Sequence, residues 1–124
     1  MKVKKITIGI KPTREFMAEA EKSMKRMAKG EKVARETGVF FEDLTTMRKV
    51  MTEKRLELVR VIKRKKPSSV YALAKLLGRD LKNVMKDLEY LEAVGLVDLR
   101  KSRSGRGETV PSVKYDKIEL EIAV

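Results

Sequence analysis

Residues 79–90 carry polar side chains whose types and spacing suit contact with a polyanion. A carboxamide such as that of Asn83 donates and accepts hydrogen bonds, so it can make a paired contact with the edge of adenine. A lysine ammonium can donate to guanine or to a phosphate oxygen. On a helical wheel of about 100° per residue, five polar residues gather on one side. They are Arg79, Lys82, Asn83, Lys86 and Tyr90. The stretch predicts a helix face that contacts nucleic acid; an ordinary solvated basic face is the alternative.

The other side of the same helix is apolar. The wheel places five residues there, which we expect to face the core: Leu81, Val84, Met85, Leu88 and Leu91. The acidic residues Asp87, Glu89 and Glu92 fall toward the flanks or the core edge. We therefore expect this helix to keep its carboxylates away from a bound phosphate backbone.

Two helices and a tight turn must position these side chains. Ser68 or Ser69 can cap a first helix, and Gly78 can close it in the left-handed conformation that glycine tolerates. Asp80 can cap the second helix, which we expect over residues 80–93. This order of helix-capping and helix-ending residues predicts a helix-turn-helix.

A third helix precedes this motif. Thr52 can cap it, and Leu56, Val59 and Ile62 form its core stripe. Pro67 ends it, because the residue before a proline disfavours the helical conformation.

A basic hairpin is expected after the motif. We predict a strand over Leu96–Arg100, a loop over residues 101–112 and a return strand region over Val113–Val124. The alternation slips at Asp116-Lys117, which predicts a bulge or bend. The segment 100–112 would form a wing whose Lys101, Arg103 and Arg106 suit a phosphate backbone or a minor groove, although such a loop can also be a solvated turn.

The first fifty residues predict a strand and a helix. Val3–Ile10 alternates, and its lysines complement the carboxylates of the C-terminal segment, so we expect the two ends to pair. Residues 13–30 form an amphipathic helix that packs either on its own subunit's core or on a second subunit. The dimerisation candidates are Phe16, Met17, Met24 and Met27. Gly38–Phe41 is either a short strand or an apolar plug, and Asp43 can cap a brief helix through Met51.

Charge and composition narrow the function. The chain has 30 Lys and Arg against 18 Asp and Glu, a net charge of +12, which favours a polyanionic partner. Between Arg60 and Arg106, thirteen cations and five acids leave +8. With no Cys and no His, we expect no metal site, no cofactor and no enzymatic activity. The apolar runs are short, so we expect a cytoplasmic protein without membrane binding.

Several of these segments resemble a known family. Leu73-Ala74, Leu77-Gly78-Arg79-Asp80 and Gly95-Leu96-Val97 are similar to prokaryotic, archaeal-type winged helix-turn-helix transcriptional regulators of the MarR/ArsR-like kind. The resemblance covers residues 52–124 well and the first fifty loosely. It implies a DNA-binding repressor that acts as a homodimer. Some similar proteins accompany toxin genes, which would make this one an antitoxin-like repressor.

The expected fold class is α+β, mainly α. We expect an N-terminal strand-helix extension for dimerisation over residues 1–51 and a winged helix-turn-helix over residues 52–124. The expected function is a sequence-specific double-stranded DNA-binding repressor. One alternative is an antitoxin-like or complex-forming interaction module, with a toxin or other protein as partner. Another is a binder of structured RNA or a non-specific nucleic-acid binder.

The expected site residues follow from the helix face, its capping serines and the wing. Base contacts are assigned to Lys82, Asn83 and Lys86, with Lys86 also suited to phosphate. Backbone or minor-groove contacts are assigned to Ser68, Ser69, Arg79, Tyr90, Lys101, Arg103 and Arg106.

Overall fold

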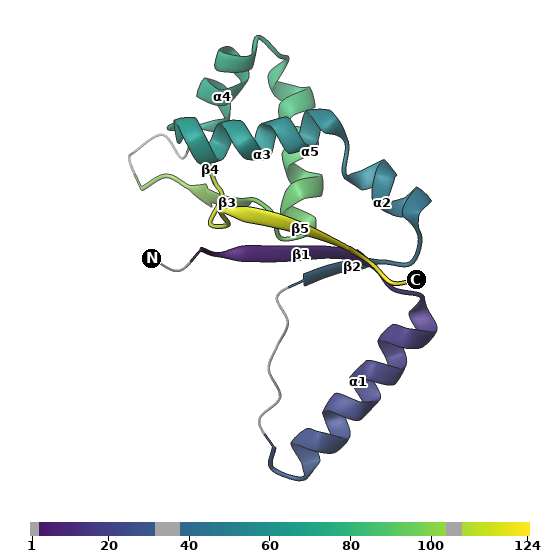
Figure 1. The fold of residues 1–124 in the computed structure, drawn as a ribbon. Coiled ribbons are helices and arrows are strands. Elements are labelled where there is room, and N and C mark those ends of the chain that lie inside the picture. Colours follow the sequence, from purple (N-terminus) through teal and green to yellow (C-terminus); the bar gives the residue numbers. More distant parts are fainter. Residues whose placement is uncertain (1–2, 32–37, 104–107) are drawn as a thin grey trace. The chain divides into compact units, whose positions relative to one another are not determined.

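The computed structural model describes residues 3–31, 38–103 and 108–124 of the chain (Figure 1). These residues form five helices and five strands, with more residues in helices than in strands. The fold is therefore mixed α/β, which confirms the predicted class at this level.

The described residues group into two compact units. One contains Val50–Asp116 with the residues up to Lys4, and the other contains Lys5–Lys49 with Lys117–Val124. The predicted domain boundary after residue 51 lies next to the point where the chain leaves the second unit and enters the first, between residues 49 and 50. Residues 117–124 were predicted to belong with 52–116, but they pair with a strand of the second unit.

In the first unit, helix α3 (Glu53–Lys65) begins and ends as its sequence predicts. Thr52 Oγ1 accepts a hydrogen bond from the Arg55 backbone N–H at 3.2 Å, and Lys66 closes the helix in the left-handed conformation just before the proline. Its buried residues are Leu58, Val59 and Ile62, whereas Leu56 is half-buried.

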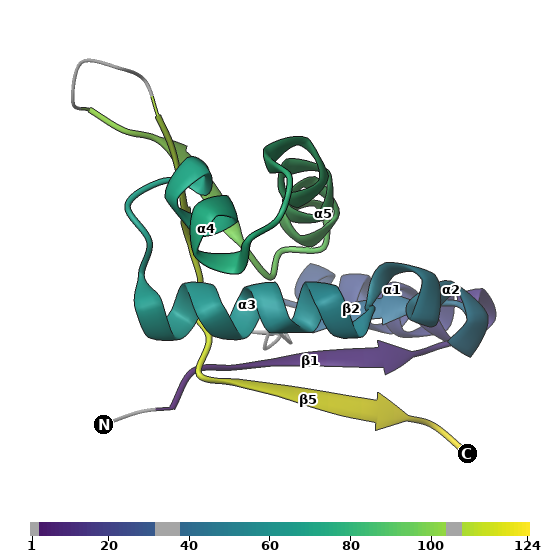
Figure 2. The same ribbon diagram turned by 90° about the horizontal axis from the view of Figure 1, so that it is seen from above.

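Helices α4 (Val70–Leu77) and α5 (Leu81–Ala93) follow, joined by a short turn. Ser69 caps α4, Gly78 ends it at φ +63°, and Asp80 caps α5, all as predicted. Helix α5 packs against α3 and α4 (Figure 2).

The hairpin of this unit differs from the prediction. Strand β3 (Asp98–Lys101) pairs antiparallel with β4 (Thr109–Ser112), which lies inside the predicted loop 101–112. The assignment of the return strand to Val113–Val124 was therefore wrong. Strand β4 accommodates Pro111, because in a two-stranded sheet a proline N, which lacks a hydrogen, can face away from the ladder. Residues 104–107 of the predicted wing lie outside the described residues.

The second unit contains a three-stranded parallel sheet in the order β2-β1-β5. Its strands are β1 (Lys5–Ile10), β2 (Gly38–Phe41) and β5 (Lys117–Ile122). The predicted pairing of the two ends of the chain is confirmed, and β5 begins after the bend predicted at Asp116. Gly38–Phe41 is a strand, which decides between the two predicted possibilities.

The second unit also contains helix α1 (Thr13–Ala28) and all but the last residue of helix α2 (Leu44–Val50). Helix α1 is fully described and has no buried residue, so the interpretation that its stripe packs on its own core is wrong. Helix α2 starts after Asp43, whose Oδ1 accepts from the Thr46 backbone N–H at 2.7 Å. Among the residues described, no helix has the length and apolar character needed to cross a membrane.

Candidate nucleic-acid interface

Helix α5 is anchored by three fully buried side chains. The side chains of Val84, Leu88 and Leu91 are 0% exposed, and burying an aliphatic side chain of this size contributes about 2 kcal/mol to folding. At the amino end, Asp80 Oδ2 accepts a hydrogen bond from the Asn83 backbone N–H at 3.3 Å. The helix is thus fixed in rotation about its axis, and the side chains opposite the buried face point outward.

The first two turns of α5 present the residues that the sequence assigned to base contact. Lys82, Asn83 and Lys86 are all exposed. Together they offer two ammonium groups and one carboxamide, which supplies both donors and an acceptor. The structure therefore brings all three onto the outer surface of one helix.

The prediction for Leu81 was wrong. This residue is 43% exposed, and Met85 is half-buried rather than buried. Side chains of a helix lean toward its amino end, so the first residue projects beyond the part of the helix that the core covers. A helical wheel treats all turns alike and misses this effect.

The acidic residues of α5 divide into two groups. Asp87 is half-buried, whereas Glu89 and Glu92 are exposed. With the core face centred on Val84, Leu88 and Leu91, the wheel places Glu89 near the outward direction. The expectation that carboxylates avoid the exposed face holds for Asp87 but not for Glu89. The cationic surface is confined to the amino-terminal half of the helix.

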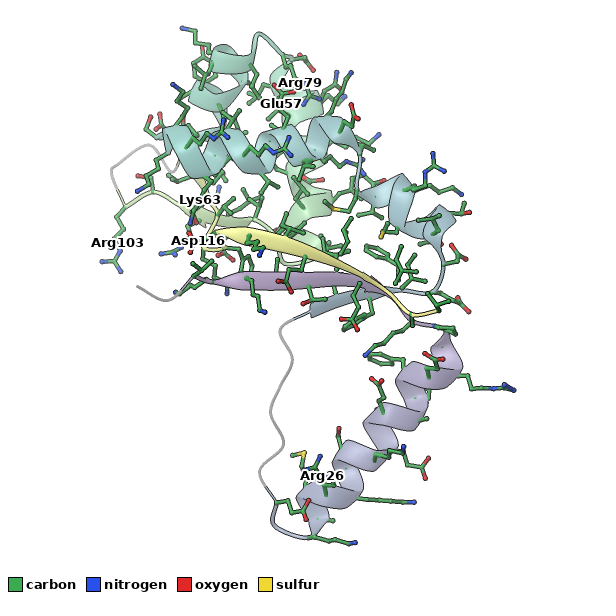
Figure 3. The ribbon with its side chains drawn as sticks, in the orientation of Figure 1. Arg26, Glu57, Lys63, Arg79, Arg103 and Asp116 are labelled. Atoms are coloured by element: carbon green, nitrogen blue, oxygen red, sulfur yellow. The ribbon has the colours of Figure 1, made fainter. Side chains whose placement is uncertain are left out.

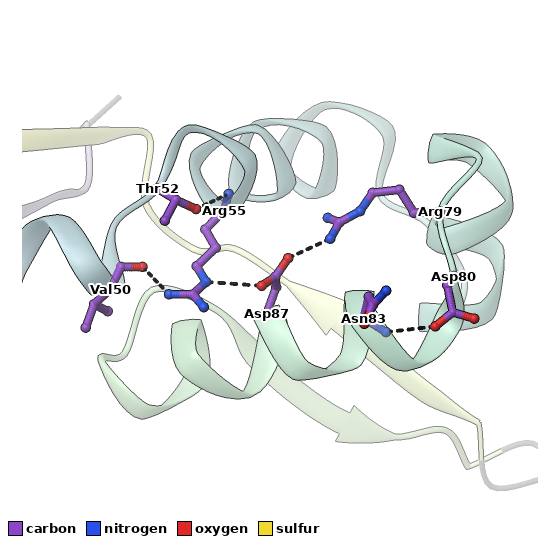
Figure 4. A network of polar contacts seen from close by, with 7 residues as sticks. All are labelled: Val50, Thr52, Arg55, Arg79, Asp80, Asn83 and Asp87. Atoms are coloured by element: carbon purple, nitrogen blue, oxygen red, sulfur yellow. Dashed lines mark hydrogen bonds and ion pairs between the residues drawn. The ribbon is translucent and has the colours of Figure 1, made fainter.

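An ion-pair network joins α3, α5 and the turn that precedes α5 (Figure 4). Asp87 Oδ1 accepts from Arg55 Nε at 3.2 Å, and Asp87 Oδ2 accepts from Arg79 Nη2 at 2.8 Å. The Arg55, Asp87 and Arg79 side chains are 12%, 17% and 25% exposed. Arg55 Nη1 also donates to the Val50 carbonyl at 2.7 Å, and the guanidinium lies 4.1 Å from the centre of the Tyr90 ring. One carboxylate therefore orients two guanidinium groups.

The network keeps Asp87 ionised. Partial burial raises the pKa of the Asp87 carboxyl, but the hydrogen bonds from Arg79 and Arg55 lower the pKa by more, so it lies below its ordinary value. Two guanidinium groups around one carboxylate leave a net positive charge beside the outer face of α5.

Sequence reasoning missed this network. It assigned Arg79 and Tyr90 to the nucleic-acid backbone, and the structure gives both residues contacts within the protein. The Tyr90 residue is 44% exposed, so its assigned role stays a prediction. The available signal was Asp87, which falls next to the core side of the wheel, where a carboxylate needs a cationic partner.

The two serines before α4 differ in exposure. Ser69 is 5% exposed, and its Oγ accepts a hydrogen bond from the Ala72 backbone N–H at 3.0 Å. Ser68 is exposed. Ser69 therefore serves the helix cap, and Ser68 is the serine whose side chain reaches the surface.

The hairpin carries exposed cations at the end of β3 that leads toward residues 104–107. Lys101 and Arg103 are exposed, and the Arg103 side chain extends away from the ribbon (Figure 3). The Ser102 backbone N–H donates to the Glu108 carbonyl at 2.6 Å and continues the ladder. Arg106, the third basic residue of the predicted wing, lies outside the described residues.

Not all of the nearby cations face solvent. Lys63 Nζ lies 3.0 Å from Asp116 Oδ1 and 3.5 Å from the Val113 carbonyl oxygen, so it joins α3 to the segment that leads into β5 (Figure 3). The Lys4 backbone N–H donates to Asp116 Oδ2 at 3.0 Å. This bond and then the bond from Lys63 lower the pKa of Asp116.

The part of the chain that the structure describes contains no group of three or more acidic side chains able to hold a metal ion. The chain has neither His nor Cys to add to such a group.

The fold and site define a small mixed α/β protein whose α5 presents lysines and a carboxamide on its outer face. The chain belongs to the HVO_A0114 family, whose model matches residues 50–120, more than half of its length. No curated protein and no solved structure matches the chain. The matched region begins at Val50, where the main segment of the first compact unit begins, and runs into β5.

Proposed function

We propose that the protein is a sequence-specific double-stranded DNA-binding transcriptional regulator, a repressor of the winged helix-turn-helix kind. In this proposal α4, the turn at Gly78 and α5 form the helix-turn-helix. The antiparallel β3 and β4 pair forms the wing. The order of three helices followed directly by a hairpin supports this assignment.

One observation carries the proposal. Lys82, Asn83 and Lys86 are exposed in the first two turns of a helix whose opposite side buries Val84, Leu88 and Leu91 completely. In helix-turn-helix proteins the second helix lies in the major groove with its amino-terminal residues against base edges. The carboxamide would pair with adenine, and the ammonium groups would donate to guanine or to phosphate.

The surrounding groups would hold the duplex in register. Arg79 and Tyr90, already oriented through Asp87 and Arg55, would border the phosphate backbone beside α5. Ser68 before α4, and Lys101 and Arg103 on the hairpin, would contact the backbone or a minor groove. Such contacts position the protein but carry no sequence information by themselves.

The proposed regulator acts as a homodimer. Two copies related by a two-fold axis would place two recognition helices about 34 Å apart, one turn of duplex DNA, on a pseudo-palindromic site. The exposed residues of α1 are candidates for the dimer contact.

Competition binding tests the nucleic-acid partner. A fluorescent genomic duplex bound by the protein is titrated with unlabelled duplex and with hairpin RNA of equal length, at several salt concentrations. We expect duplex DNA to compete better than RNA. If six to ten phosphates are contacted, affinity falls by about 10³ to 10⁵ between 50 and 200 mM salt. Equal competition by RNA would contradict the proposal.

A second candidate is an antitoxin-like or complex-forming interaction module. The apolar stripe of α1, which has no buried residue, favours this candidate, because flexible thioethers adapt well to partner surfaces. Copurification of a stoichiometric partner, together with no salt-sensitive binding of duplex DNA, would support this candidate over the first.

A further inference from the structure

Helix α1 presents a long apolar stripe that the described chain leaves uncovered. Phe16, Met17, Met24 and Met27 are 52%, 63%, 71% and 60% exposed. A helix of 16 residues is marginally stable in water by itself, and most helical stability in proteins comes from packing an amphipathic face. The stripe therefore calls for a partner surface.

The stripe has the same spacing in both directions from Lys22. Phe16 and Ala28 lie six residues to either side, Met17 and Met27 lie five, and Ala20 and Met24 lie two. A two-fold axis at this level sets each member of a pair opposite the other on a second, antiparallel copy. Two of the three pairs then match a large side chain with a small one, which lets the helices approach closely.

The charges of α1 have the matching asymmetry. Thr13–Glu21 contains Arg14 and three glutamates, which gives −2. Residues 22–29 contain Lys22, Lys25, Arg26 and Lys29 with no acid, which gives +4. An antiparallel pair sets the acidic half of one helix beside the basic half of the other, whereas a parallel pair would bring like charges together.

We propose that α1 forms an antiparallel helix pair with α1 of a second copy of this chain, about a two-fold axis level with Lys22. This helix pair specifies the contact of the homodimer in the proposed function, and the inference rests on that homodimer. We expect the stripe to be covered by α1 of a second copy. When the second helix runs in the opposite direction, the apolar residues of the two helices meet in pairs, and the acidic half of each helix meets the basic half of the other.

Disulfide trapping tests the pairing, since the natural chain has no cysteine. The full-length variants Met17→Cys and Met27→Cys are oxidised separately and as an equimolar mixture. We expect a covalent dimer only in the mixture. Each variant alone holds its two sulfurs about 15 Å apart along the axis, ten residues at 1.5 Å, beyond the roughly 7 Å Cα separation that a disulfide spans.

Covalent dimers of Met17→Cys alone would show a parallel pair and overturn the proposal. Sedimentation equilibrium gives an independent measurement. Met24→Glu, in the stripe, should weaken self-association at least tenfold, while the matched Ala18→Glu on the polar face should leave it unchanged. Equal weakening of self-association by Met24→Glu and Ala18→Glu would overturn the inference. A monomeric wild type, or a different protein as the sole partner of α1, would also overturn it. None of these measurements uses DNA, so loss of duplex binding with an intact helix pair would count only against the proposed regulator.

Discussion

At the scale of single residues, the proposed function would give the backbone and the side chain of Asn83 different tasks. Its backbone N–H is held by the Asp80 side chain at 3.3 Å, while the residue itself is exposed. Removal of the carboxamide should therefore leave the helix start intact. This separation makes Asn83 suitable for testing base recognition without disturbing the fold.

We predict that Asn83→Ala reduces discrimination at one base pair by about 1–3 kcal/mol and leaves binding to random duplex unchanged. Affinities for the preferred duplex, for each of its single-base variants and for random duplex measure this effect. The control is Arg103→Ala, an exposed hairpin residue expected to weaken all duplexes alike. Equal losses for Asn83→Ala on preferred and random DNA would remove its assigned role.

Substitution of Asp87 should affect the stability of the protein, because its carboxylate binds two arginine side chains. We predict that Asp87→Asn lowers the free energy of unfolding at pH 7 by about 2 kcal/mol, because Arg55 and Arg79 lose a charged acceptor in a partly buried place. Urea unfolding monitored by circular dichroism measures the change. Glu89→Gln, which alters an exposed acid of the same helix, is the control and should change stability little.

Wild type and Asp87→Asn should also differ in how their stability depends on acid pH. The pKa of folded Asp87 lies below its unfolded value, so its stabilising contribution is complete above about pH 4 and is lost as pH falls through the folded pKa. The stability difference between wild type and Asp87→Asn should therefore shrink from pH 7 to pH 3. A constant difference would show that the carboxylate charge is not what stabilises the network.

At the scale of elements, the turn between α4 and α5 depends on Gly78. Its φ is +63°, and a Cβ built there would meet no atom within 4 Å, so backbone conformation rather than space requires glycine. We predict that Gly78→Ala lowers the free energy of unfolding by about 1 kcal/mol. Gly78→Asn should cost less, because Asn tolerates this conformation. Similar losses for the two variants in thermal unfolding would contradict this explanation.

The parallel sheet has a different requirement at Gly9. A Cβ there would lie 2.8 Å from the Phe40 ring and 2.9 Å from the Glu121 backbone oxygen. We predict that Gly9→Ala loosens the sheet at a cost of about 1–3 kcal/mol. Amide hydrogen exchange over Ile6–Ile10 measures this loosening, and it should be faster in Gly9→Ala than in the control variant Thr7→Ala. Unchanged exchange would show that the strands shift without cost.

Local chemistry predicted most of the elements. The caps at Thr52, Ser69, Gly78 and Asp80 depend on neighbouring backbone groups, so sequence position alone reveals them. The hairpin register does not have this property, since it depends on the pairing of Leu99 with Pro111 across the sheet. The sequence pattern alone therefore placed the return strand too late in the chain.

The site divides in the same way. The outward direction of Lys82, Asn83 and Lys86 follows from helical periodicity, and the sequence was sufficient to predict it. The Asp87 network joins residues 32 and 8 positions away, Arg55 and Arg79, which no local pattern brings together. The exposure of Leu81 depends on where the core ends, which is also a tertiary property.

At the scale of the whole molecule, net charge and the family match answer different questions. A charge of +12 favours a polyanion and predicts steep salt dependence, but it does not select a sequence. Membership of the HVO_A0114 family establishes relationship over residues 50–120 and carries no activity with it. Specificity must therefore be tested on the protein itself.

The most direct test of the proposed regulator is a genome-wide selection of duplex fragments bound by the purified full-length protein at about 150 mM salt, where non-specific contacts are weakened. We predict an enriched pseudo-palindromic consensus whose half-sites are about 10 base pairs apart and contain a conserved adenine. In a parallel selection with Asn83→Ala, the preference at that adenine should disappear. A pool without any consensus would contradict sequence-specific DNA binding by α5.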